Sequence, residues 1–154
     1  MNVRLGLARR TDTPKLAAMA RLLVEAGLPG TWDERRIRRC LRSRDCVVLA
    51  ARAGKRVVGF AIMEFLDARA HLVLLAVEPS HQGRGIGRAL LEWLESTART
   101  AGTFLIDLEV RANNLAARGF YARLGFAEAG TRRGYYAGRE DAVRMARDIN
   151  AARA

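Results

Sequence analysis

The hydrophobic and polar positions of the N-terminal third predict one strand and two helices. Apolar residues alternate through residues 3–7, as in a strand with one buried face. Apolar residues then recur at helical spacing from Thr13-Pro14 to Gly27, and proline suits an early helical position. A second helix, with one apolar face and one arginine-rich face, is predicted from Asp33 to Leu41.

The central part of the chain predicts a β-hairpin followed by a buried strand. The runs Cys46–Arg52 and Val57–Leu66 are separated by the turn residues Ala53-Gly54-Lys55. His71–Val77 follows and is apolar at every position after His71, so we expect it to lie centrally in the sheet with both faces covered. Pro79 ends this strand.

The C-terminal half predicts a strand, helix, strand unit. Ile86 to Gly102 has helical spacing, and Phe104–Arg111 alternates between apolar and mostly polar residues. A right-handed crossover would place this strand parallel to His71–Val77. A further helix, Leu115–Leu124, is expected to end at Gly125.

Two short strands near Phe126–Ala129 and Ala142–Met145 are predicted to complete the fold. The expected fold class is α/β (α+β), in a single domain over residues 1–154. Half of the residues are hydrophobic, which is enough to bury one core. No apolar run is long enough to cross a bilayer and no signal peptide is apparent, so we expect a cytoplasmic protein without a membrane partner.

The two cysteines and the basic charge exclude few functions. Cys40 and Cys46 match no zinc or redox spacing, so we interpret them as reduced structural thiols and expect no metal. The net charge of +11 comes from 25 arginines and two lysines spread along the chain. Direct contact with nucleic acid and a merely solvated arginine surface explain this charge equally well.

A glycine-rich segment is the main candidate for chemistry. Gln82-Gly83-Arg84-Gly85-Ile86-Gly87-Arg88 lies between a buried strand and an amphipathic helix. Glycines there allow close approach of a ligand, and free N–H groups at the helix start attract anions. The segment lacks the lysine of a Walker loop and the glycine spacing of a dinucleotide fingerprint. We therefore predict a pyrophosphate cradle in which Arg84 and Arg88 add contacts to phosphate oxygens.

These motifs resemble the GNAT N-acetyltransferase superfamily. The segment Gln-x-x-Gly-x-Gly after Ala76-Val77-Glu78-Pro79 is similar to its acetyl-CoA motif, and residues 108–114, 120–121 and 124–126 resemble its second motif. With Arg132–Tyr136 and Glu140–Ala142, the chain looks most like the bacterial ribosomal-protein alanine N-acetyltransferases over residues 57–147. The resemblance implies a mixed, mostly antiparallel central sheet with a parallel, splayed central strand pair and helices on both faces.

The resemblance also implies roles for individual residues. Glu109 is then the catalytic base, and Tyr121 is the acid that protonates the coenzyme A thiolate. Read without the resemblance, Glu109 is a solvated strand carboxylate and Tyr121 a packed helix aromatic. Neither His71 nor His81 has a carboxylate partner that the sequence reveals, so we expect both to be structural or exposed.

Binding residues follow in the same way. Acetyl-CoA would contact a set of residues on the central strand, the glycine segment and the start of the next helix: Leu75, Ala76, Val77, Gln82, Gly83, Arg84, Gly85, Ile86, Gly87, Arg88 and Asn114. A backbone N–H near Ala76 or Val77 would stabilise the oxyanion, and Trp32 and Tyr135 would bind the acceptor. The expected acceptor is the N-terminal α-amine of a protein such as a ribosomal protein. The alternatives are a small amine, a lysine side chain, or a ribosome- or RNA-binding module on the same fold.

Overall fold

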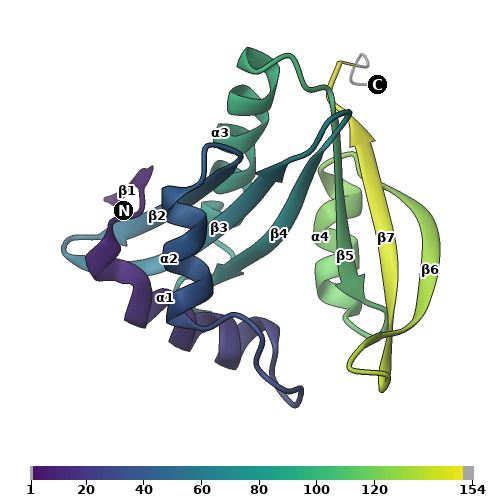
Figure 1. Cartoon of the computed structure of the whole chain (residues 1–154), viewed down its shortest axis with the longest axis horizontal. Helices are drawn as coiled ribbons and strands as arrows, with labels where there is room; N and C mark the ends of the chain where they lie inside the picture. Colours follow the sequence, from purple (N-terminus) through teal and green to yellow (C-terminus); the bar gives the residue numbers. More distant parts are fainter. Residues whose placement is uncertain (1, 151–154) are drawn as a thin grey trace.

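A computed structural model describes residues 2–150, and within them a seven-stranded sheet forms the centre of the molecule (Figure 1). The strand order is β1-β2-β3-β4-β5-β7-β6. Neighbouring strands are antiparallel except β4 and β5, which are parallel. The expected sheet is therefore confirmed. The strands are β1 (Val3–Leu7), β2 (Cys46–Ala53), β3 (Arg56–Phe65), β4 (Ala70–Val77), β5 (Leu105–Arg111), β6 (Ala127–Tyr136) and β7 (Glu140–Asp148).

Helices cover both faces of the sheet, as expected (Figure 1). One hydrophobic cluster joins the sheet to α3 and Tyr121 of α4, and a second joins it to α1 and α2. No helix in residues 2–150 is long and apolar enough to cross a membrane. The helical segments are η1 (Arg10–Asp12), α1 (Thr13–Met19), η2 (Ala20–Val24), α2 (Glu34–Arg42), η3 (Pro79–His81), α3 (Ile86–Thr100) and α4 (Leu115–Arg123).

The two C-terminal strands are longer than the sequence predicts. The expected strands near Phe126–Ala129 and Ala142–Met145 extend to Ala127–Tyr136 and Glu140–Asp148. The first of them, β6, is an edge strand and most of its residues are exposed, so no buried face imposes apolar alternation on it. The prediction was too short because it relied on that alternation.

The parallel pair separates soon after it forms. Strand β4 pairs with β5 at only two positions, the second being His71 opposite Asp107. The pairing of β3 with β4 shifts between Ile62 and Met63, which leaves Val73 as an extra residue on β4. From there β4 and β5 diverge, with α4 visible behind the gap (Figure 1). The splayed strand pair implied by the sequence is thus present, and it exposes one backbone edge of β4.

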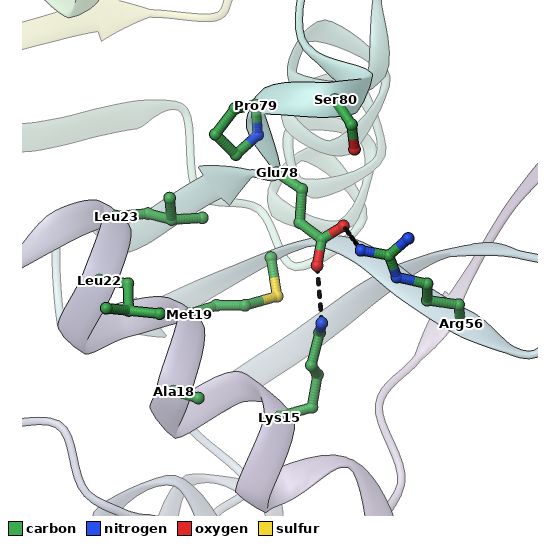
Figure 2. Close-up of a pocket in the computed structure, with 9 residues that line it drawn as sticks. All are labelled: Lys15, Ala18, Met19, Leu22, Leu23, Arg56, Glu78, Pro79 and Ser80. Atoms are coloured by element: carbon green, nitrogen blue, oxygen red, sulfur yellow. Dashed lines mark hydrogen bonds and ion pairs between the residues drawn. The ribbon is translucent and has the colours of Figure 1, made fainter.

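A buried carboxylate holds three parts of the fold together beside the end of β4. Glu78 accepts a hydrogen bond from Lys15 Nζ of α1 at 2.6 Å and another from Arg56 of β3, also at 2.6 Å (Figure 2). The hydrogen bond from Lys15 is the main reason that the pKa of Glu78 is lowered. Because Glu78 directly follows β4, these ion pairs fix the position from which the glycine segment starts.

Candidate active site

The glycine segment forms a tight loop that leads directly into α3. Gly83 and Gly85 have φ values of +76° and +82°, a left-handed conformation that disfavours any side chain. Gly85 is the N-cap of α3, and no side chain caps this end of the helix. The first N–H groups of α3 therefore face outward with the positive end of the helix dipole, which favours an anion.

A cavity of about 490 Å³, here called the loop cavity, lies between the glycine loop, the end of β4 and α4. Its volume is in the range of small-molecule sites. Gln82 ties the loop to the strand, because its Nε2 donates to the Val77 carbonyl at 2.9 Å. Arg84 is exposed and does not line the cavity. The other expected cofactor residues all line it: Leu75, Ala76, Val77, Gln82, Gly83, Gly85, Ile86, Gly87, Arg88 and Asn114.

Tyr121 lines the loop cavity from α4. Its ring makes edge contacts with Phe120 and Phe126, at centroid distances of 5.1 and 5.7 Å. Burial raises the pKa of the Tyr121 phenol, so the group stays protonated across the physiological pH range. Asn114 caps the same helix by accepting a hydrogen bond from the Ala117 N–H at 3.1 Å. The helix thus holds a protonated phenol at the wall of the loop cavity.

A second cavity of about 480 Å³, here called the glutamate cavity, lies between β4, β5, the segment before α2 and the hairpin of β6 and β7. Trp32 and Tyr135, the expected acceptor-binding residues, both line it. Trp32 is covered by the Arg36 guanidinium, 3.8 Å from the ring centroid. The carboxylate of Glu25 accepts hydrogen bonds from the Trp32 and Thr31 N–H groups and fixes this segment.

Glu109 lines the glutamate cavity from β5, and its side chain is only 7% exposed. The solvated carboxylate considered from the sequence is therefore wrong. Its Oε2 lies 3.1 Å from His71 Nε2, and its Oε1 lies 3.3 Å from Arg132 Nε. The hydrogen bond to His71 is the main cause of a lowered pKa, which outweighs the desolvation of the carboxylate. Glu109 is consequently ionised near neutral pH.

His71 corrects another expectation from the sequence. It has two carboxylate partners, since its Nδ1 lies 2.7 Å from Asp107 Oδ1 and its Nε2 contacts Glu109. Burial lowers the pKa of His71, but the hydrogen bonds to both carboxylates outweigh burial and raise it to about 9. The parallel register that places His71 opposite Asp107 cannot be read from a single sequence. Period-2 alternation along β5, which puts Asp107 and Glu109 on one face, was the available signal.

The two cavities meet along β4. Val73 and Leu74 line the glutamate cavity, and the next three residues, 75–77, line the loop cavity. The cavities also meet at η2, where Leu23 lines the loop cavity and the next residue, Val24, lines the glutamate cavity. A group bound in one cavity can therefore reach a group bound in the other across the splayed strands.

The cysteines take no part in either cavity. Both are free thiols, and they pack against the hydrophobic cluster between the sheet and α1 and α2. Neither Cys40 nor Cys46 lines the loop cavity or the glutamate cavity. The arrangement offers a carboxylate and a phenol for proton transfer, but no thiol nucleophile.

Residues 15–126 match the family described as Acetyltransferase (GNAT). The ribosomal protein bS18-alanine N-acetyltransferase of Salmonella typhimurium is 46% identical over 101 residues, covering 64% of this chain and 68% of that protein. The N-alpha-acetyltransferase RimI of Mycobacterium tuberculosis is 35% identical over 153 residues, covering 95% and 92%. The crystal structure of the ribosomal-protein-S18-alanine N-acetyltransferase from Escherichia coli is similar with a TM-score of 0.82, at 33% identity and coverage of 99% and 97%.

The family match over residues 15–126 and the likeness to the N-acetyltransferases of Salmonella typhimurium and Mycobacterium tuberculosis define an acyltransferase. The chain belongs to the GNAT acetyltransferase family and is an N-acetyltransferase. The resemblance drawn from the motifs is thereby confirmed.

Proposed function

We propose that this enzyme transfers acetyl from acetyl-CoA to the N-terminal α-amine of a ribosomal protein. The observation that carries the proposal is the meeting of two cavities at the splay of β4 and β5, one beside a helix N-terminus and one containing an ionised carboxylate. Two relatives, from Salmonella and Escherichia coli, are named for alanine acetylation of this kind of protein. Such an acceptor would place the reaction in the cytoplasm.

The loop cavity would hold acetyl-CoA. The N–H groups of Gly83, Gly85 and the first turn of α3 would bind the pyrophosphate, and Arg88 could add a charge-assisted contact. Arg88 now pairs with Glu92 at 2.8 Å on the surface, so that contact requires it to exchange partners. The pantetheine would run along the unpaired edge of β4 toward the second cavity.

The oxyanion donor can be narrowed from two candidates to one. The Glu78 N–H donates to the Val58 carbonyl, so Glu78 and Val58 form a hydrogen-bonded pair between β3 and β4. Hydrogen-bonded and non-bonded pairs alternate in antiparallel strands, which turns the Ala76 N–H toward β3 and the Val77 N–H toward the splay. The Gln82 side chain binding the Val77 carbonyl agrees with this orientation. We therefore assign oxyanion stabilisation to Val77.

Glu109 would take the proton from the acceptor amine, and Tyr121 would give a proton to the departing thiolate. Trp32 and Tyr135 would form the walls around the acceptor. Attack is direct, because neither cysteine lies at a cavity. Enzyme incubated with radiolabelled acetyl-CoA and no acceptor should retain no covalent label, whereas labelled Cys40 or Cys46 would refute direct transfer.

The acceptor is tested by comparing amines with one free-thiol assay. The set comprises a peptide with a free N-terminal alanine, the same peptide blocked by formylation but carrying a lysine, and a polyamine. We expect turnover of the free N-terminus only. Turnover of the blocked lysine peptide or of the polyamine alone would replace the proposed acceptor by one of those amines and leave the acetyl-CoA site intact.

A further inference from the structure

Asp107, His71 and Glu109 lie in a row, of which His71 and Glu109 line the glutamate cavity. His71 occupies the middle position, 2.7 Å from Asp107 through Nδ1 and 3.1 Å from Glu109 through Nε2. Asp107 is 2% exposed and Glu109 is 7% exposed, whereas the His71 side chain is 19% exposed. The imidazole is thus the member of the row with the most access to solvent.

The charges around Asp107 determine which nitrogen of His71 carries a proton and which one faces Glu109. Asp107 also contacts Arg69 at 3.1 Å and Arg144 at 2.9 Å, so it remains an anion and accepts the Nδ1 proton of His71. This leaves Nε2 of His71 facing Glu109. The other charged or titratable groups around the row are Glu64 on β3, Arg132, Tyr135 and Tyr136 on β6, and Glu25 and Arg36 at the cavity wall.

We propose that His71 exchanges a proton with Glu109 in each turnover, so that Asp107, His71 and Glu109 act as one proton relay. This proposal rests on the proposed role of Glu109 as the base. The N–H bond of the acceptor breaks and its proton passes to the Glu109 carboxylate. Neutral His71 then takes that proton at Nε2 while its Nδ1–H stays on Asp107. The imidazolium finally returns the proton to solvent, and the Tyr121 phenolate left after protonation of the thiolate takes a proton from solvent, which restores the starting state.

The relay explains how an acidic carboxylate can serve as a base. Hydrogen bonding from His71 is the main cause of the lowered pKa of Glu109, so the pKa is lowered while His71 is protonated and is higher when His71 is neutral. In the state with neutral His71, Glu109 can take the amine proton and pass it on to the imidazole. His71 is the adjoining group with a pKa high enough to accept it, since the two carboxylates raise its pKa to about 9. His71 is therefore a positioning and proton-accepting residue that acts through Glu109.

The first test measures the coupling without any acceptor. The chain has two histidines, so ¹³C-labelled histidine gives two NMR signals, and the one lost in His71→Gln belongs to His71. We expect the His71 signal to titrate near pH 9 in the wild type and at least one pH unit lower in Glu109→Gln. A His71 titration that does not depend on Glu109 would overturn the proposed proton exchange.

The second test measures the pH profile of kcat with the N-terminal alanine peptide. Wild-type kcat should rise through about pH 9, where His71 becomes neutral. His71→Gln should lose about tenfold or more in kcat and keep only the limb of the acceptor amine near pH 8, with the KM for acetyl-CoA unchanged. A His71→Gln enzyme with the wild-type profile would reduce His71 to a structural role.

The two arms separate failure of the relay from failure of the proposed function. If the enzyme acetylates only a small amine or a lysine, the kinetic arm is run with that amine, and the relay still predicts the same loss in His71→Gln. Retention of full kcat in His71→Gln with the true acceptor refutes the relay whatever the acceptor is. Circular dichroism and thermal melting of both variants verify that they are folded.

Discussion

Replacement of Gly85 by alanine should weaken cofactor binding in addition to the loss of stability that its backbone conformation causes. Gly85 has φ of +82°, and a left-handed conformation costs an L residue roughly 1–2 kcal/mol. For a chain of this size that lowers Tm by roughly 2–8 °C. A Cβ at Gly85 meets no protein atom within 4 Å, so the fold has room for the methyl group. Yet Gly85 lines the loop cavity, where the methyl group and any relaxation of φ disturb the N–H groups that face the pyrophosphate.

Gly54 offers a matched control. It also has a left-handed φ, +63°, and free space for an added methyl group, but it lies in the turn between β2 and β3 and lines neither cavity. Gly54→Ala should lose similar stability and keep its affinity for CoA. Gly85→Ala should bind CoA at least about tenfold more weakly, which corresponds to about 1.4 kcal/mol. Calorimetric titration with CoA and thermal melting measure both effects, and unchanged affinity in Gly85→Ala would refute the pyrophosphate assignment.

Three further variants separate chemistry from stability. Tyr121→Phe should lower kcat roughly a hundredfold to ten-thousandfold at unchanged affinity for acetyl-CoA. Because burial raises the pKa of Tyr121, its phenol stays protonated and the wild-type kcat should not fall below about pH 10 through deprotonation of this acid. Glu109→Gln should lower kcat and lose the rise near pH 9, because without the Glu109 carboxylate the amine proton has no path to neutral His71, and a variant that keeps the wild-type pH profile would contradict the role of Glu109 as base. Arg147→Met leaves the buried Glu95 without its main ion-pair partner and should cost about 3–5 kcal/mol in urea unfolding, less when combined with Glu95→Leu.

The sequence predicts well those helices and strands that have one buried face or are buried on both faces. The hairpin of β2 and β3 and the helix α3 follow their predicted ranges closely, because buried positions impose apolar residues at a fixed period. The edge strand β6 lies mostly in solvent and was predicted too short for the opposite reason. Strand β4 is central as predicted, but Val73, Leu75 and Val77 are only partly buried, because each packs against a hydrophobic cluster and also lines a cavity.

The residues of the candidate site likewise divide into some that the sequence reveals and some that it does not. Loop residues such as Gln82 and Gly85 could be found because they lie in one short segment, and that segment as a whole has the composition of an anion-binding loop. The row through His71 could not, because it depends on the register between two strands whose connection contains the whole of α3. A shift of one residue between β4 and β5 would turn His71 away from Asp107 and Glu109. Only the three-dimensional pairing specifies that contact.

Strand β4 can serve both cavities because its pairing with β5 stops at His71. If the strands stayed paired, hydrogen bonds of the sheet would occupy the edge of β4 that includes the Val77 N–H, and no cofactor could lie between the strands. The extra residue Val73 follows the last pair by two positions and turns the strand at the point where the cavities meet. The splay therefore gives up ladder hydrogen bonds between β4 and β5 and leaves backbone donors of β4 that a thioester oxygen could use under the proposed function. Ion pairs of Glu78 with Lys15 and Arg56 hold the freed end of β4 in place from the other side.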